Sequence, residues 1–312
     1  IRDLNERGHN VGLAIQAVRY RCSNKDCGYI CSEEYPSIDS GKMTIRLRES
    51  IKEDAFLAPF KEVADKYALS VPTVALLFKE KADELRKEAE VYAPRVLGID
   101  EVHLDRKYYG VFVDIERRSI IEITKSRSKA TVKAYINSLP NKENIIAVTM
   151  DMWAQYRDAV HDTLPGVPVV IDKFHVIKEL NAQKLRELLE KYPQFSDPYD
   201  MKEIFRAIYL SESRAEAEAT YEEWVRILHD EKHLTCFDNF INTVNRWHTE
   251  IFNYFDYPYT NAQTESMNNR IREIDGAGRG YSFEVLRDKM VLRPYVARRS
   301  GAVDFSVLDE DD

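Results

Sequence analysis

The spacing of apolar residues changes along the chain, and the change falls near Pro94. Before that point apolar residues recur mainly at helical intervals, whereas short apolar runs separated by turns dominate after it. Three of these runs are predicted strands joined by short turns, over residues 96–104, 108–115 and 119–124. A helix, a strand, a helix and a strand are predicted to follow, over residues 129–139, 144–150, 156–163 and 167–171. This order predicts an antiparallel meander extended by parallel strands.

Three antiparallel strands followed by alternating helices and strands is the order of the ribonuclease H-like fold. We therefore expect an α/β core with a mixed five-stranded sheet, whose first part covers residues 94–175. Strand patterns nearly vanish over residues 176–255, so this stretch is predicted to be a helical insertion. Residues 256–300 are expected to complete the core, and residues 301–312 form an acidic tail.

The last part of the core is predicted to contain two helices. The first begins near Asn261 and carries Arg270 and Arg272. Residues 275–283 are predicted to form a glycine-rich loop, and one further helix is predicted over residues 283–299.

Residues 41–93 are predicted to form a helix-turn-helix. Apolar spacing is helical over residues 54–68 and again over residues 71–85. Ser70 stands where the N-cap of the second helix is expected, and Pro72 lies in its first turn. The second helix carries Lys79 among charges of both signs, so an αα-hairpin used for packing stays open as an alternative.

Residues 1–40 are predicted to form a partial zinc ribbon. Alternation over residues 11–22 indicates a strand that leads into a cluster of three cysteines, Cys22, Cys27 and Cys31. A structural zinc site needs four ligands, usually in two close pairs, and only Cys22 and Cys27 form such a pair here. Cysteines without a metal are the alternative. A tight cluster in a large chain, with Cys236 alone elsewhere, favours a cytoplasmic protein over a disulfide scaffold.

The net charge of -8 argues mildly against nucleic acid as a partner, because phosphate binding rests on Lys and Arg. The charge is uneven, however, since residues 262–301 hold eight Lys or Arg against five acids. No apolar run approaches the roughly 18 residues of a membrane span, so no membrane segment is expected. The chain begins at Ile1 without a signal-peptide pattern, and an upstream piece is expected to be missing.

Three acidic residues, Asp100, Asp151 and Glu265, stand where the predicted fold would bring them to one sheet edge. Asp100 interrupts the first strand, where an unpaired buried carboxylate would be costly. Asp151 directly follows the fourth strand, which neighbours the first in this fold, and Glu265 lies on a helix expected to pack there. Carboxylates suit Mg²⁺ or Mn²⁺, and two such ions stabilise both oxygens of an in-line phosphoryl displacement.

Each acid also has an ordinary alternative. Asp151 alone could form a turn or cap a helix, and Glu265 alone could be a solvated helix residue. Glu101 cannot share a site with Asp100, because adjacent side chains of a strand point to opposite faces. The prediction of a two-metal site therefore depends on the three acids together.

Four segments carry a resemblance to a known family. They are GIDEVHL around Asp100, TMDMW around Asp151, the run DKFHVIKELN, and TNAQTESMNNRIR around Glu265. In this order, over nearly the whole chain, they resemble the transposases of bacterial insertion sequences of the ISL-three type, members of the DDE superfamily. The resemblance implies that Asp100, Asp151 and Glu265 hold two catalytic Mg²⁺ or Mn²⁺ ions.

The resemblance assigns two further groups of residues. His175, three positions after Asp172, matches an element beside the active site, where it would orient a phosphate or donate a proton. A helix-cap contact of His175 is the alternative. The family begins with two cysteine pairs, of which Cys22 and Cys27 match the later one, so Zn²⁺ is expected only if ligands upstream of Ile1 are present.

DNA is the partner that the resemblance implies. Arg19, Arg21 and Lys79 would belong to the region that recognises the element ends, and Arg270 and Arg272 are further DNA-binding candidates. The protein is expected to bind terminal inverted repeats, hydrolyse the 3′ ends with a metal-activated water and join them to target DNA. Because two ends are processed together, a homo-oligomer is expected.

Two other interpretations stay open. A catalytically inactive relative, kept as a sequence-specific DNA-binding protein, would show the same segments. Another metal-dependent nuclease of the same fold, such as a junction resolvase, is disfavoured by the helical insertion and the predicted helix-turn-helix.

Overall fold

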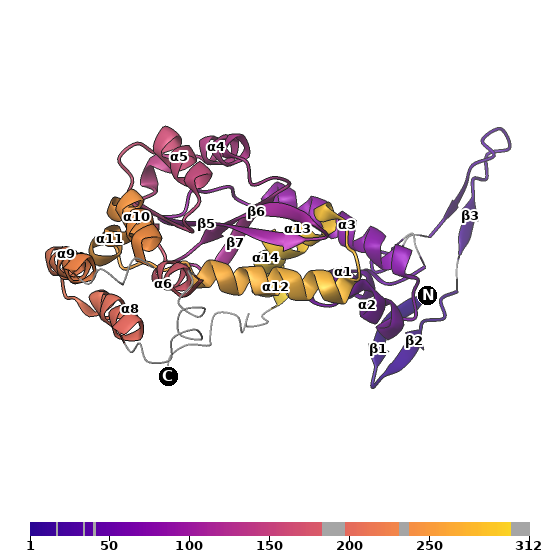
Figure 1. Ribbon diagram of the computed structural model, residues 1–312. Helices are drawn as coiled ribbons and strands as arrows, with labels where there is room; N and C mark the ends of the chain where they lie inside the picture. The colour runs from indigo at the N-terminus through magenta and orange to yellow at the C-terminus, as the bar shows by residue number, and fades with distance from the viewer. Residues whose placement is uncertain (17, 34, 40–41, 183–196, 231–236, 301–312) are drawn as a thin grey trace. The chain divides into compact units, whose positions relative to one another are not determined.

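The computed structural model describes residues 1–16, 18–33, 35–39, 42–182, 197–230 and 237–300 (Figure 1). The predicted acidic tail, Cys236 and parts of the predicted insertion (residues 183–196 and 231–236) lie outside the described residues. The chain forms two compact units. Unit 1 comprises Ile1–Ala89 and the residues from Glu273 onward, and unit 2 comprises Glu90–Arg272. None of the helices described is long and apolar enough to cross a membrane.

Unit 2 is built on a mixed five-stranded sheet, which confirms the predicted α/β class. The strands are β5 (Val96–Leu104), β6 (Lys107–Asp114), β7 (Ser119–Thr124), β8 (Ala147–Met150) and β9 (Val169–Ile171). Their order across the sheet is β7-β6-β5-β8-β9. Strands β5, β6 and β7 pair antiparallel, whereas β5, β8 and β9 pair parallel. The predicted meander with its parallel extension is therefore confirmed.

One face of this sheet is covered by helices α4 (Lys129–Ser138) and α5 (Ala154–Thr163), which lie side by side (Figure 1). A short 3₁₀ helix, η1 (Lys142–Asn144), precedes β8. Leu97 and Ile99 of β5 belong to the same hydrophobic core as the buried residues of these helices. Alternate residues of β5 therefore face α4 and α5, and the residues between them face the opposite side.

Helix α12 (Ala262–Gly278) packs against that opposite side of β5. Gly98 allows the close approach, because a Cβ atom at this position would lie 2.6 Å from Oγ1 of Thr264. Thr264 is fully buried. The helix predicted near Asn261 is thus confirmed, and it lies on the face to which Gly98 and Asp100 point.

Helices fill the described part of the predicted insertion, as expected. They are α6 (Lys173–Ala182), α8 (Asp197–Ala207), η2 (Ile208–Leu210), α9 (Arg214–Asp230), α10 (Asp238–Arg246) and α11 (His248–Asp256). Trp224 of α9 is fully buried, and its Nε1 donates a hydrogen bond of 2.7 Å to the carbonyl of Met201. Its ring packs edge-on against Phe205, Phe237 and Phe240. An aromatic cluster therefore holds three of these helices together.

Three helices supply most of the core of unit 1: α1 (Ile45–Leu57), α2 (Phe60–Lys66) and α3 (Val71–Glu88). Leu292 and Val296 from the C-terminal segment belong to the same core. The single helix predicted over residues 54–68 is wrong, because the chain breaks at Ala58 and Pro59 between α1 and α2. Proline has no N–H to continue the hydrogen bonds of α1.

The predicted start of α3 is confirmed. Oγ of Ser70 accepts a hydrogen bond of 3.3 Å from the N–H of Thr73, and Pro72 lies in the first turn. The turn before it contains Ala68 with φ +46°, a left-handed conformation that reverses the chain between α2 and α3.

Two predictions for the C-terminal part are wrong. Helix α12 runs through Gly276 to Gly278, and the loop begins only at Arg279 and Gly280, whose φ values of +51° and +94° end the helix. The last predicted helix is two helices, α13 (Phe283–Val291) and α14 (Arg293–Ser300). Pro294 explains the break, since it fits the first turn of a helix but cannot continue one.

A buried lysine of α13 contacts the C-terminal end of α1. Nζ of Lys289 donates hydrogen bonds to the carbonyls of Ala55 and Ala58, the latter at 2.9 Å. These carbonyls lack the partners that a continuing helix would supply. Burial lowers the pKa of Lys289 to about 7.

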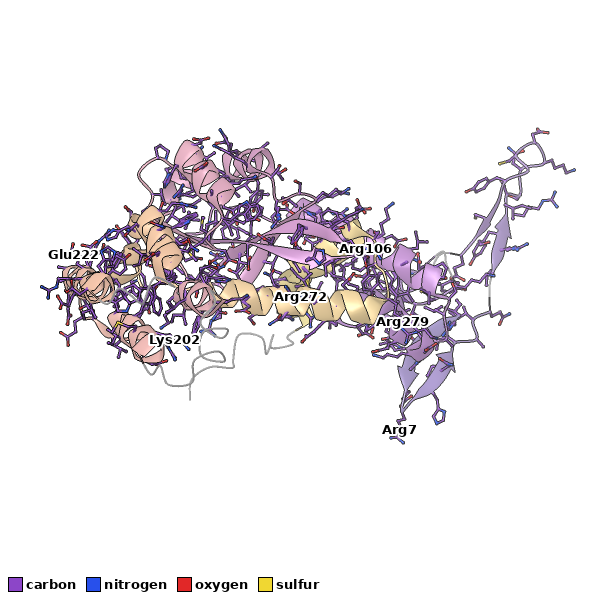
Figure 2. All side chains as sticks on the ribbon, in the orientation of Figure 1. Arg7, Arg106, Lys202, Glu222, Arg272 and Arg279 are labelled. Atoms are coloured by element: carbon purple, nitrogen blue, oxygen red, sulfur yellow. The ribbon has the colours of Figure 1, made fainter. Side chains whose placement is uncertain are left out.

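Unit 1 also contains two antiparallel hairpins, β1 (Arg2–Glu6) with β2 (His9–Gly12) and β3 (Arg19–Arg21) with β4 (Ile30–Ser32). The exposed side chain of Arg7 lies at the tip of the first hairpin (Figure 2). The single strand predicted over residues 11–22 is wrong, because β2 pairs with β1 and ends at Gly12, whereas β3 pairs with β4.

Candidate active site

The parallel pairing of β5 and β8 brings Asp100 and Asp151 together. Ile99 pairs with Met150 in this register. Asp100 and Asp151 are the next residues along these two adjacent segments, so they lie side by side. Asp100 continues β5, whereas Asp151 directly follows β8. The strand order derived from the sequence predicts this arrangement, and the structure has it.

Asp100 is a buried carboxylate with two hydrogen-bond donors. Its side chain is 7% exposed. Oδ1 accepts from the N–H of Glu101 at 2.7 Å, and Oδ2 accepts from Nδ2 of Asn268 at 2.7 Å. Burial, followed by the negative charge of Asp151, raises the pKa of Asp100 to about 7. A cation between the two carboxylates would relieve this repulsion.

Asp151 is half-buried and also has a donor on each oxygen. Oδ1 accepts from Nδ2 of Asn261 at 3.2 Å, and Oδ2 lies 3.0 Å from Nε2 of His175. The hydrogen bond to Asp151 raises the pKa of His175 above its usual value, against the effect of burial. The side chain of Asp151 therefore belongs to this cluster and does not cap helix α5, whose N-cap position is Trp153.

Asp172, directly after β9, holds the start of the helix that carries His175. Oδ1 of Asp172 accepts a hydrogen bond of 2.7 Å from the N–H of Phe174, at the start of α6. Oδ2 of Asp172 accepts from the N–H of Asn261 at 2.6 Å and thereby holds the residue just before α12. The helix-end contact thus belongs to Asp172, whereas the imidazole of His175 faces Asp151.

Glu265 is not brought into contact with the two aspartates. Its side chain is exposed on α12. Within the part of the chain that the structure describes, no three His, Cys, Asp or Glu side chains are placed to hold one metal ion. Glu265 nevertheless lies four residues after Asn261 and three before Asn268, so the three residues share one side of the helix.

Asn261 and Asn268 were not singled out by the sequence analysis. Both are buried, at 2% and 3% exposure, and each donates to one of the two aspartates. Their spacing of seven residues, about two helical turns, is the signal in the sequence that could have placed them on one face.

Glu101 points to the opposite face from Asp100, as expected. It forms an ion pair with Arg127 and accepts a hydrogen bond of 3.0 Å from the hydroxyl of Tyr156. The guanidinium of Arg127 lies 3.8 Å from the ring centroid of Tyr108 and 4.1 Å from that of Trp153. Glu101 is therefore neutralised by its own partners behind the strand.

None of the remaining candidates contacts the aspartates in the part of the chain that the structure describes. Arg19, Arg21 and Lys79 belong to unit 1 and have exposed side chains. Arg272 is exposed on α12 (Figure 2), and Arg270 is half-buried on the same helix. Cys22 and Cys27 are exposed free thiols and Cys31 is a half-buried one, and no metal-holding group of three includes them among the described residues.

The donor set of the cluster suits a hard divalent cation. Four carboxylate oxygens from Asp100 and Asp151 are the ligands that Mg²⁺ and Mn²⁺ prefer. Burial and the facing charge of Asp151 raise the pKa of Asp100, so the ionised form of this carboxyl is disfavoured unless a counter-charge lies beside it. These two residues fit a metal ion, whereas the described residues do not supply a third carboxylate placed to share it.

Comparison with known proteins agrees with this geometry. The model of a family described as transposase, the ISL3 type of DDE transposases, matches residues 97–183 and 179–290. These stretches cover more than half of the chain and include both aspartates and Glu265. The transposase for insertion sequence element IS1001 of Bordetella parapertussis is 27% identical over 154 residues. The matched part is 48% of this chain and 37% of that relative, so it spans little more than a third of the relative's length.

Proposed function

The chain belongs to the ISL3-type family of DDE transposases, and from this premise we propose that it cleaves and joins DNA at the ends of an insertion sequence. It would bind the terminal inverted repeats, release their 3′ ends by hydrolysis and transfer them to target DNA. The observation that supports the proposal is the position of Asp100 on β5 beside Asp151, which directly follows the adjacent parallel strand β8, with the helix that bears Glu265 packed on the same face of β5.

Asp100 and Asp151 would hold the divalent ions, and Glu265 would complete the ligand set. Mg²⁺ or Mn²⁺, when bound, supplies positive charge for the attacking and leaving oxygens of the phosphoryl transfer. The chain's own residues fix the carboxylates: backbone and asparagine N–H groups orient Asp100, and His175 orients Asp151. His175 also adds positive charge beside the position of a DNA phosphate when its imidazole is protonated.

DNA binding would be shared between segments of the chain. Residues 41–93 would act as a helix-turn-helix, in which α2 and α3 flank the tight turn at Ala68 and α3 presents Lys79 to the DNA. Arg19 and Arg21 would contribute from residues 1–40, where Cys22 and Cys27 would be half of a zinc site completed by further ligands. Basic side chains contact phosphates without regard to sequence.

The catalytic fold would be of the ribonuclease H type. Residues 94–175 and 256–300 would form its two parts, and residues 176–255 would be the helical insertion between them. Arg270 and Arg272 would bind the DNA backbone near the reacting phosphate, because they follow Glu265 on the same helix. Two element ends must be processed together, so the active protein would be a homo-oligomer.

The test is cleavage of a labelled duplex that carries one end of the element, in the presence of Mg²⁺ or Mn²⁺. The variants Asp100→Asn, Asp151→Asn and Glu265→Gln should bind this duplex as the wild-type chain does and lose cleavage by at least about a hundredfold. Glu273→Gln, which changes an exposed acid on the same helix, is the matched control and should cleave normally. Cleavage by Glu265→Gln at nearly the wild-type rate would overturn the assignment of that residue.

The second candidate is an inactive relative that binds DNA sequence-specifically. The exposed position of Glu265, outside the aspartate cluster, is the observation that favours it. Under this alternative the wild-type chain binds the element end tightly but leaves the duplex uncut with either metal ion, even when two ends are supplied together.

A further inference from the structure

Every carboxylate oxygen of the aspartate pair accepts a hydrogen bond from an N–H group. Asp100 is bound by the backbone of Glu101 and by Asn268, and Asp151 is bound by Asn261 and His175. Two of these four donors, Asn261 and Asn268, come from α12 and the residue directly before it. One continuous segment of the chain thus contacts both aspartates.

The two asparagines are held firmly. The N–H of Asn261 donates to Asp172 at 2.6 Å, and its Oδ1 accepts from the hydroxyl of Thr149 at 3.2 Å. Nδ2 of Asn268 donates at 2.7 Å to Asp100 and at 3.3 Å to the carbonyl of Glu101. Both side chains are almost fully buried, so their amides cannot exchange these partners for bulk water without a local opening.

The spacing of these residues fixes the helix in two ways. Contacts at Asn261 and Asn268 lie about two turns apart, so together they set both the rotation of α12 about its axis and its position along that axis. Glu265 lies between them on the same side of the helix. Any rotation of α12 about its axis would change the direction in which Glu265 points and would break at least one of the two amide contacts.

We propose that Asn261 and Asn268 are positioning residues that align α12, and with it Glu265, against Asp100 and Asp151. The inference rests on the proposed function, because it takes those three acids as the catalytic carboxylates. Each asparagine ties one aspartate to the helix that carries the third acid. The order of the motif, Asn261, Glu265, Asn268, places the acid between its two anchors.

The hydrogen bonds also orient the aspartates for a cation. A carboxylate oxygen has two lone pairs, and a single N–H donor occupies one of them. The other remains directed away from the donor and can coordinate a metal ion. Donors of this kind, behind a metal ligand, are worth about ten- to a hundredfold in metal affinity.

A packing role and a positioning role of Asn268 predict different effects of substitution. If Asn268 only filled space, a leucine, which has the same branched shape but no polar atoms, would serve nearly as well. If its amide orients Asp100, Asn268→Leu should leave the fold intact but weaken Mn²⁺ binding and the chemical step. A merely structural change would alter stability and DNA affinity without a specific loss of metal affinity.

The experiment measures Mn²⁺ binding to the full chain by titration calorimetry, together with single-turnover cleavage of the element-end duplex. We expect Asn268→Leu and Asn261→Leu to lower Mn²⁺ affinity by about ten- to a hundredfold and to slow cleavage, with unchanged affinity for the duplex. Asn268→Gln, which retains an amide donor, should recover part of the loss. Asn269→Leu changes the neighbouring exposed asparagine and should leave Mn²⁺ affinity unchanged.

The outcomes distinguish this inference from the proposed function. If the wild-type chain binds Mn²⁺ and cleaves, and both leucine variants match it, the positioning role is wrong while the transposase activity stands. If the wild-type chain neither binds Mn²⁺ nor cleaves, the proposed function fails and the inference fails with it. Should Asn268→Leu not fold, Asn268→Ala provides the same comparison without the larger side chain.

Discussion

A Cβ atom at Gly98 would lie 2.6 Å from Oγ1 of Thr264, so β5 and α12 are in closer contact than any residue other than glycine allows. We predict that Gly98→Ala forces α12 away from the strand and lowers the free energy of unfolding by about 1 to 3 kcal/mol. The same Cβ would also meet Cδ1 of Ile115 at 2.6 Å, but that end of the side chain can rotate away. Urea unfolding curves with an unchanged slope would measure the loss.

The control for this prediction is Thr264→Ala. Oγ1 of Thr264 is buried, and none of the described residues forms a hydrogen bond with it, so its removal should cost little. In the double variant the clash is relieved, and part of the stability lost in Gly98→Ala should return. A Gly98→Ala protein as stable as the wild type would show that α12 does not depend on this contact.

Asp100→Asn should make the protein more stable than the wild type in metal-free buffer and less stable than the wild type when Mn²⁺ is present. In metal-free buffer the substitution removes a buried charge that faces Asp151, so the variant should be more stable than the wild type by about 0.5 to 2 kcal/mol. Mn²⁺ at about a hundred times its dissociation constant should add roughly 2.7 kcal/mol to the wild type alone. Differential scanning calorimetry at both conditions tests the reversal. Equal stabilisation of both proteins by Mn²⁺ would place the ion elsewhere.

Trp224 should be the most sensitive position of the helical region between β9 and α12. Trp224→Ala leaves a cavity beside Phe205 and Phe240 and should cost about 3 to 5 kcal/mol. Trp224→Phe keeps a ring but loses the hydrogen bond to the carbonyl of Met201, so its cost should be smaller. Leu210→Ala is the control, because Leu210 is 82% exposed and its loss should stay within about 0.5 kcal/mol. Denaturant unfolding gives all three values.

Lys289 should make stability rise with pH on the alkaline side. Burial lowers its folded pKa to about 7 from an ordinary value of 10.5. Between these two pH values the unfolded chain binds a proton that the folded chain does not, so the free energy of unfolding increases with pH. Lys289→Met should flatten this increase. Thermal unfolding of both proteins from pH 7 to 10 measures it, and parallel curves would contradict the prediction.

The sequence predicted the sheet well because its strands are marked locally. The runs around Leu97, Val111 and Val148 combine apolar residues with clear turns, and the strand order predicted from them places Asp151 beside Asp100, as the structure does. Breaks at proline were less well predicted. Residues around Pro59 and Pro294 keep their apolar spacing across the break, so the period alone does not reveal that one helix is in fact two.

The partners of the aspartates could not be predicted in the same way. An asparagine on a polar helix has no pattern that distinguishes a buried amide from a solvated one. Asn268 becomes recognisable only when α12 is packed on β5, where its amide meets Asp100. Glu101 was assigned to the opposite face from strand alternation alone, but its neutralisation by Arg127 depends on a residue in the loop before α4.

The hydrogen bond between Asn268 and Asp100 joins residues that are 168 positions apart in the chain. At a translation rate of roughly 5 to 20 residues per second, about 10 to 30 s pass between the synthesis of the strand and that of its helix. During this interval the nascent chain carries Asp100 and Asp151 without the helix that aligns them. The proposed chemistry thus becomes available only late in synthesis, and a product that stops short of α12 would lack Glu265 and both of its anchors.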